Sequence, residues 1–167
     1  MGPTFRTVVV ASCLSVAACS GGGGSAASSA PPAQPSNGAP IAFETTKITP
    51  GADRDGKLAV RAYNFADKTI AGYTVAVRYT DKAGAVIKVG VGTPFEKDVA
   101  WTSFAGRGLE CKPKSWCKLE IEMIEVPAAT AKADVMLTSA KALGPDNFKF
   151  EEDDLWKSGK GMGNWPL

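Results

Sequence analysis

The sequence predicts one all-β domain, an antiparallel sandwich of about seven strands, preceded by a leader and a linker. Three observations support this fold class. From Ile41 onward, short segments alternate apolar and polar residues, with turn-forming residues about every ten positions. Residues 20–40 carry neither charge nor aromatic side chain, so they cannot bury enough surface to fold. Helical patterns are nearly absent, apart from a turn or two expected near residues 153–157.

Residues 1–18 have the pattern of an export signal. Arg6 supplies a positive charge, an apolar stretch at 8–18 follows, and small residues precede Cys19. A helix needs about 20 apolar residues to cross a bilayer, but this run stops at Ser20, which four glycines follow. The stretch is therefore expected to direct export rather than to span the membrane.

The motif Val16-Ala17-Ala18-Cys19 resembles the lipobox of bacterial lipoproteins. The resemblance implies cleavage after Ala18 and acylation of Cys19, with palmitate among the acyl chains. Several chains, at about 0.8 kcal/mol per buried methylene, suffice for stable anchoring. In that family an aspartate after the cysteine can mark inner-membrane retention, so Ser20 favours the outer membrane. The alternative is an ordinary cleaved signal in which Cys19 is incidental.

The composition and charge of the chain after the leader limit the kinds of partner it can bind. Residues 19–40 are expected to be a flexible tether that holds the domain about 25 Å from the bilayer. Cleavage removes one of the 19 basic residues, Arg6, and none of the 17 acidic ones. The nearly balanced charge gives no strong field for nucleic acid. We therefore expect no nucleic-acid partner, and we expect the chain to reach the membrane through its N-terminal lipid.

The four cysteines divide into two pairs by location. Cys13 leaves with the leader and Cys19 carries lipid, so Cys111 and Cys117 remain for an oxidising compartment. We expect a disulfide between them, which would stabilise the fold by about 2 kcal/mol. The alternative, part of a zinc site, would need four ligands, and the chain contains no histidine.

Each strand is expected where alternation is bounded by turn residues. Leu58, Val60 and Ala62 share one face of the second segment, and the third carries Tyr73, Val75, Val77 and Tyr79 at period two. In the sixth, Cys117, Leu119, Ile121 and Met123 face inward and Lys118, Glu120 and Glu122 outward. Turns are expected at 53–56, 64–69 and 81–84. The seven segments are 42–48, 57–65, 70–80, 86–91, 98–104, 117–126 and 131–139.

Residues 77–87, Val-Arg-Tyr-Thr-Asp-Lys-Ala-Gly-Ala-Val-Ile, resemble the FxLYD-type domains of bacterial surface proteins. Asp81 and Gly84 match the motif, Asn64 fits it, and Val77, Tyr79 and Thr80 stand where it has Phe, Leu and Tyr. The similarity covers about residues 57–126 and implies an immunoglobulin-like or fibronectin III-like sandwich with a binding or spacer role. It carries over no functional residues.

We expect no catalysis, cofactor or metal site. The lack of histidine removes Ser-His-Asp, Cys-His and histidine-base mechanisms, and serine–lysine or two-carboxylate mechanisms have no spacing signature here. Residues 53–56, Asp-Arg-Asp-Gly, resemble the start of a calcium loop, but Asn64 stands where a glutamate is required. A turn is the expected structure. The acidic run at 151–154 is expected to be solvated.

Two candidate binding regions follow. A rigid basic patch around Trp116 would suit an anionic glycan, a lipid headgroup or an acidic protein surface; alternatively, this loop is solvated and Trp116 caps the core. The aromatic residues of the tail would either dock on the sandwich or recognise a partner. The candidate residues are Arg107, Lys112, Lys114, Trp116, Lys118, Trp156 and Trp165.

The sequence thus predicts a leader (1–18), a lipidated tether (19–40), a sandwich (41–143) and a tail (144–167). The expected function is that of a non-catalytic, lipid-anchored cell-envelope protein, a binding or structural module that contacts another envelope component. The alternative is an accessory or inhibitory lipoprotein that engages a protein through its tail. An enzyme is the third possibility.

Overall fold

A computed structural model describes residues 30–146, 149–151 and 153–159 of the chain. These residues form strands and loops, and none of them belongs to a helix that could cross a bilayer. The strands are β1 (Ile41–Thr49), β2 (Gly51–Asn64), β3 (Ile70–Thr80), β4 (Val86–Ile87), β5 (Ala100–Ala105), β6 (Trp116–Val126), β7 (Lys132–Ala142) and β8 (Trp156–Lys157).

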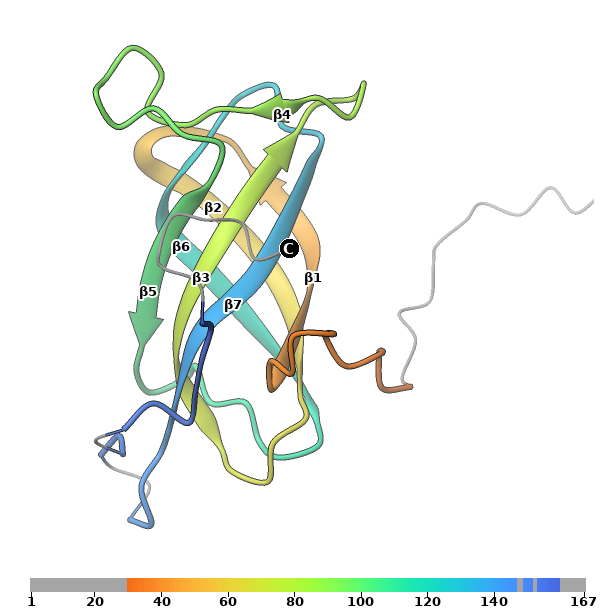
Figure 1. Cartoon of the computed structure of the whole chain (residues 1–167), viewed down its shortest axis with the longest axis vertical. Helices are drawn as coiled ribbons and strands as arrows, with labels where there is room; N and C mark the ends of the chain where they lie inside the picture. The colour runs from red at the N-terminus through yellow and green to blue at the C-terminus, as the bar shows by residue number, and fades with distance from the viewer. Residues whose placement is uncertain (1–29, 147–148, 152, 160–167) are drawn as a thin grey trace, which may run out of the picture.

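The strands form two antiparallel sheets packed face to face (Figure 1). One sheet has the order β1-β2-β6. In the other, β3 pairs with β7 on one side and with β4 and β5 on the other, while β8 extends the sheet beyond β7. The chain crosses from one sheet to the other after β2, after β5 and after β6. The predicted all-β sandwich is confirmed.

The core lies between the sheets where period-two alternation placed it. Leu58, Val60 and Ala62 are fully buried on β2, and Tyr73, Val75, Val77 and Tyr79 are buried on β3. Alternate side chains of a strand point to opposite faces, so the charged residues between them remain outside. The expected inward positions on both strands are confirmed.

The prediction is wrong for one residue of β6 that was expected to face inward. Met123 is 67% exposed, whereas Leu119 and Ile121 are buried as expected. Leu58 pairs with Ile121 and Gly56 with Ile124, so β6 contains one more residue than β2 between these pairs. Such a bulge shifts the alternation. Met123 has a φ of 55° and turns outward, and Ile124 takes the core position.

Other boundaries also differ from expectation. The expected turn at 53–56 lies within β2 as a bulged segment, with Asp53 at a φ of 52°. The segment 86–91 forms strand only at Val86–Ile87, and the fifth strand begins two residues later than expected, at Ala100. The helical turn expected near 153–157 is instead β8, because these residues pair with β7 at Ser139 and Ala140.

A disulfide and a buried amide hold one end of the sandwich. Cys111 and Cys117 are bonded, with Cα atoms 5.3 Å apart, which confirms the predicted pair. Cys111 also exchanges backbone hydrogen bonds with Ile70 of β3, whereas Cys117 belongs to β6. The disulfide therefore links the loop bound to one sheet with a strand of the other. Asn64, fully buried, donates from Nδ2 to the Cys111 carbonyl oxygen at 2.8 Å.

The two long sides of the sandwich differ. On one side β1 meets β7, and the Thr45 hydroxyl donates to the Ala133 carbonyl oxygen at 2.7 Å. On the other side β5 and β6 face each other at the edges of their sheets without pairing in the described chain. This second side is open and forms the candidate site.

Candidate binding groove between β5 and β6

A groove of about 1390 Å³ runs along the open side of the sandwich. We call it the β5–β6 groove. The strands β5 and β6 form its walls, and it extends past β6 to Thr46 of β1 and to Ala59 and Arg61 of β2. The loop 88–99 closes one end, and Gly108 and Leu109 lie at the other. Its volume exceeds the roughly 300–1,000 Å³ of small-molecule pockets, so its size suits a macromolecular segment.

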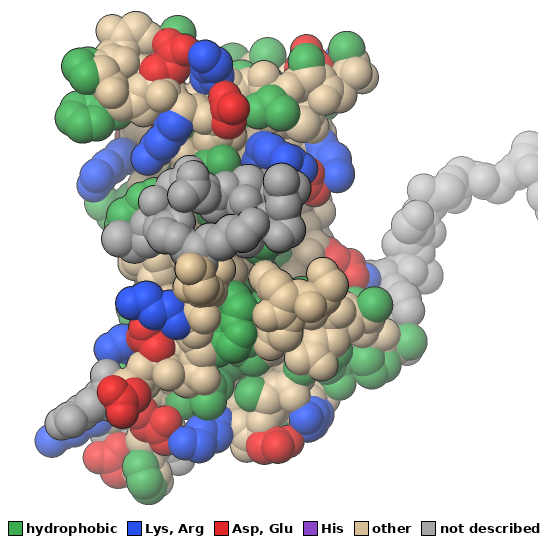
Figure 2. Space-filling model, in the orientation of Figure 1, with side chains coloured by type: hydrophobic (Ala, Val, Ile, Leu, Met, Phe, Trp, Pro, Cys, Tyr) green, Lys and Arg blue, Asp and Glu red, His purple; other side chains and the backbone are tan. Residues whose placement is uncertain are grey.

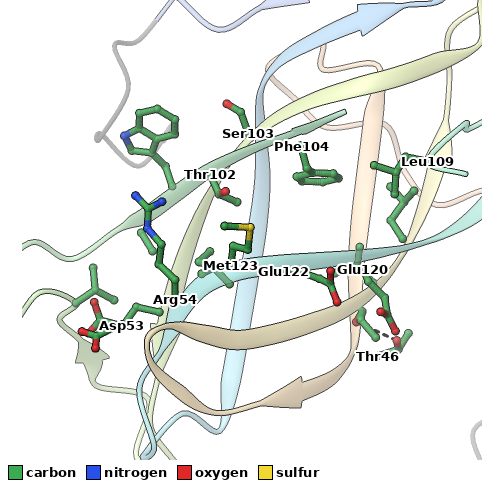
Figure 3. A pocket seen from close by; sticks show the side chains of 18 of the residues that line it. Thr46, Asp53, Arg54, Thr102, Ser103, Phe104, Leu109, Glu120, Glu122 and Met123 are labelled. Atoms are coloured by element: carbon green, nitrogen blue, oxygen red, sulfur yellow. Dashed lines mark hydrogen bonds between the residues drawn. The ribbon is translucent and has the colours of Figure 1, made fainter. Parts of the chain in front are cut away.

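Three large apolar side chains are exposed along the β5–β6 groove. Phe95 is 77% exposed in the loop 88–99, Met123 is 67% exposed on β6, and Trp101 is 38% exposed on β5. Figure 3 shows Met123 between Arg54 and Glu122. Single exposed apolar residues are common, but a group of them along one groove is typical of an interaction surface.

The loop that carries Phe95 is fixed to the sandwich by backbone and carboxylate contacts. Val89 and Lys97 form an antiparallel bridge. The Gly90 amide donates to the Glu125 carboxylate, with the shorter of its two contacts at 2.9 Å. These bonds hold the loop against the end of β6. Phe95 is thus presented by an ordered hairpin-like loop.

An exposed ion pair crosses the same loop. Lys88 Nζ donates to Glu96 Oε1 at 2.8 Å. This bond, followed by the Gly92 amide, lowers the pKa of Glu96, and the same contact raises the pKa of Lys88. Both groups are exposed, so solvent and salt screen their attraction. The pair orients the loop more than it stabilises it.

The charges around the β5–β6 groove have both signs. On β6, Lys118 alternates with Glu120 and Glu122 along the wall. Lys57 Nζ lies 2.6 Å from Glu122 Oε1, and this hydrogen bond raises the pKa of Lys57. On another face, the outer side of the five-stranded sheet, Figure 2 shows basic and acidic side chains intermixed as well. The groove therefore has no strong preference for an anionic or a cationic ligand.

The two strand edges at the groove differ in side-chain charge. The sequence of β5, Ala-Trp-Thr-Ser-Phe-Ala, has no charged residue and no proline, whereas β6 carries a lysine and three glutamates. Charged side chains protect sheet edges from unwanted pairing. The edge of β5 lacks this protection, so it is the edge of the groove that is more available for pairing with another chain.

The residues of the predicted basic patch have different surroundings in the structure. Trp116 lies on the outer face of β6, with the Arg61 guanidinium 4.2 Å from its ring centre and Tyr63 at 5.4 Å. Lys114 Nζ lies 3.1 Å from Asp67 Oδ1. Lys118 lines the groove. Arg107 and Lys112 are exposed in the loop between β5 and β6.

Of the two tail tryptophans, Trp156 is half-buried in β8 and packs against the core. Trp165 lies outside the described residues. The acidic run at 151–154 contributes ion pairs to the domain, because Glu151 lies 2.6 Å from Lys68 and Asp154 lies 3.9 Å from Lys141. This part of the tail is therefore attached to the sheet.

Sequence reasoning did not select Phe95, Trp101 or Met123 as site residues. Phe95 follows a Gly-Thr-Pro turn, and an aromatic residue in such a loop could have been noticed. Nothing in the sequence indicated that Met123 is exposed, because its exposure results from the bulge in β6. Trp101 stood in an expected strand, whose outward face the alternation alone could not assign.

The described residues contain no group of three His, Cys, Asp or Glu side chains that could hold a metal ion. What the groove offers is apolar surface, strand edges and paired charges. Comparisons with protein-family models, curated proteins and solved structures find no match.

Proposed function

We propose that this chain is a non-catalytic, lipid-anchored binding module of the bacterial cell envelope. Cys19 carries the lipid, residues 20–40 form the tether, and the sandwich contacts another envelope component through the β5–β6 groove. The proposed location is the outer membrane, since Ser20 follows the acylated cysteine.

The observation that carries the binding role is the exposure of Phe95, Trp101 and Met123 along one groove. Burying apolar surface contributes about 25 cal/mol per Å², and aromatic residues and methionine are enriched at interfaces. Intermixed charges around the groove favour a protein ligand over a polyanion. The groove thus replaces the loop around Trp116 as the leading candidate surface.

Site-specific photocrosslinking in cells tests the binding role. A benzophenone side chain is placed at Phe95 or at Met123, and the matched control is Val86, which is 46% exposed outside the groove. We expect a discrete adduct from the two groove positions and none from Val86. A further variant carries the benzophenone at Lys112 in the disulfide loop. Adducts from that variant alone would move the site to this loop, and no adduct from Phe95 or Met123 would contradict the proposal.

The anchor is tested separately by metabolic labelling with palmitate. Cys19→Ala is expected to abolish labelling and release the protein from the membrane. Cys13→Ala is the matched control, because Cys13 precedes the cleavage site, and should label normally. Equal labelling of both variants would refute acylation at Cys19.

A further inference from the structure

The edge of β5 that faces the β5–β6 groove has unpaired backbone groups, and the hydrogen-bond pattern shows which ones. Gly72 pairs with Ala105, and in the next pair along the ladder the Gly106 amide donates to the Ala71 carbonyl oxygen at 3.2 Å. Hydrogen-bonded and non-hydrogen-bonded pairs alternate along an antiparallel ladder. The residues that bond to β3 are therefore Ala100, Thr102 and Phe104, and those that direct their N–H and C=O groups to the open side are Trp101, Ser103 and Ala105.

The backbone groups of Trp101, Ser103 and Ala105 have no partner in the part of the chain that the structure describes. Among these residues β5 pairs with β3 alone, and the backbone bonds of the surrounding loops involve none of the three. Unpaired groups of this kind at a sheet edge can pair with another strand. We call the free N–H and C=O groups of Trp101, Ser103 and Ala105 the open edge of β5.

The facing edge of β6 is less suited to pairing. The Asn64 amide donates to the Ser115 carbonyl oxygen at 3.0 Å, so the same alternation directs the backbone groups of Lys118 and Glu120 to the open side of β6. Charged side chains at a sheet edge disfavour the addition of a strand. The uncharged β5 is therefore the strand with which a ligand in the groove would pair.

The groove beside the open edge of β5 is apolar on its inner side. Thr102 and Phe104 face inward, because their partners on β3 belong to the core. Figure 3 shows both side chains on the side of β5 toward Met123. The apolar residues that line this inner side are Val89, Phe104, Leu109, Leu119, Met123 and Ile124.

An extended polypeptide segment is the ligand that satisfies both the open edge and the apolar inner side. Paired residues of antiparallel strands project to the same side, so residues bonded to the open edge would point outward, like Ser103. The residues between them would point onto the apolar lining. The six residues of β5 span about 20 Å at about 3.4 Å per residue. The segment therefore matches β5 in length and has apolar side chains at alternate positions.

We propose that the β5–β6 groove binds an extended segment of a partner protein, which pairs with the open edge of β5 as an added strand. This inference rests on the proposed binding role of the groove and names the class of ligand. Backbone hydrogen bonds to the open edge supply affinity, and the alternate apolar side chains supply specificity. Charges of both signs around the groove place no further demand on the segment.

Binding of a synthetic peptide to the full chain in detergent micelles tests the proposal, with fluorescence anisotropy as the readout. The probe alternates threonine and valine and ends in lysine on both sides. When its valines face the groove, its threonine amides bond to β5 and its valine amides point away. N-methylation of the threonine amides should therefore weaken binding by about tenfold or more. N-methylation of the valine amides is the matched control and should change binding by less than about twofold.

Ser103→Pro tests the same hydrogen bonds from the side of the protein. It removes the central N–H donor of the open edge, and sheet edges accept proline where the N–H faces away from the neighbouring strand. Ser103→Ala is the matched control, because it also loses the contact of 2.9 Å between the Ser103 and Thr74 hydroxyls but keeps the N–H. We expect Ser103→Pro to bind the probe about tenfold more weakly than Ser103→Ala does.

Amide hydrogen exchange of the unaltered chain, measured by NMR, shows whether the open edge is free. The Thr102 and Phe104 amides should exchange slowly, and those of Trp101, Ser103 and Ala105 should exchange fast until the probe is added. Slow exchange of these three amides without the probe would overturn the proposal. Protection that disappears on dilution would identify a second copy as the occupant, and protection that persists would identify the chain itself.

The added strand and the binding role of the groove fail in different experiments. No binding of the probe, equal effects of the two methylated peptides, or equal binding by Ser103→Pro and Ser103→Ala would overturn the added strand. Crosslinks from Phe95 and Met123 in cells report contact at the groove whether or not a strand is added. Adducts that persist in Ser103→Pro would show a ligand held by side chains alone, and would overturn this inference while the binding role stands.

Discussion

Asn64→Ala is expected to lower the free energy of unfolding by about 3 kcal/mol. The Asn64 side chain is fully buried. Its Nδ2 atom donates to the carbonyl oxygens of Lys68 at 2.9 Å and Cys111 at 2.8 Å, and its Oδ1 atom accepts from the Ala66 amide at 2.8 Å. Each bond contributes about 1 kcal/mol net, and buried groups left without partners cost more.

Asn37→Ala is the matched control, because the exposed Asn37 side chain accepts only one hydrogen bond here, from the Ala39 amide at 3.1 Å. Thermal unfolding followed by circular dichroism measures both variants. At about 4 °C per kcal/mol for a domain of this size, Asn64→Ala should lower Tm by about 12 °C and the control by much less. If both variants melt within a few degrees of each other, the buried amide does not hold the turn and the disulfide loop together.

Three further predictions concern the core. The Tyr79 hydroxyl is buried with no hydrogen-bond partner in the described chain, whereas the Tyr73 hydroxyl lies 2.8 Å from two acceptor carbonyl oxygens. Urea unfolding should therefore show that Tyr79→Phe stabilises the fold and Tyr73→Phe destabilises it, each by about 1 kcal/mol. The opposite order would contradict this contact pattern. Burial raises the pKa of both phenols above 10.0, so these tyrosines ionise at lower pH in the unfolded state than in the folded state. The free energy of unfolding should therefore fall above pH 10 by about 1.4 kcal/mol per pH unit for each tyrosine. An absorbance titration in which both phenols ionise near pH 10 while the circular dichroism remains native would refute this. Replacing Cys111 and Cys117 with serine should cost about 2 kcal/mol in the same urea assay, and unchanged stability would show that the short loop is ordered without its disulfide.

The sequence predicted the parts of the fold that depend on local alternation. The burial of Val75 and Val77 follows from period-two patterning, with the polar residues Thr74 and Arg78 only half-buried on the opposite face of β3. The Asp81-to-Gly84 turn was also predictable, because Asp81 Oδ1 accepts from the Ala83 amide at 2.8 Å and Gly84 has a φ of 84°. These features need only residues close together in the chain.

The features that the sequence did not predict depend on residues that are far apart in the chain. Met123 leaves the core because β6 must pair on both sides of the bulge near Gly56 of β2, which no periodicity in β6 reveals. Strand β8 exists because the edge of β7 accepts two residues of the tail. The β5–β6 groove arises where two unpaired edges meet, so its lining could be found only after the sheets were assembled.

The central claim, that a lipid holds this sandwich at the membrane while its groove binds, depends first on the chemistry at Cys19. The most direct measurement is the mass of the N-terminal peptide of the mature protein, extracted from membranes in detergent. We predict a peptide that begins at Cys19 and carries fatty acyl chains. A mature chain that begins at another residue, or an unmodified Cys19, would contradict the account.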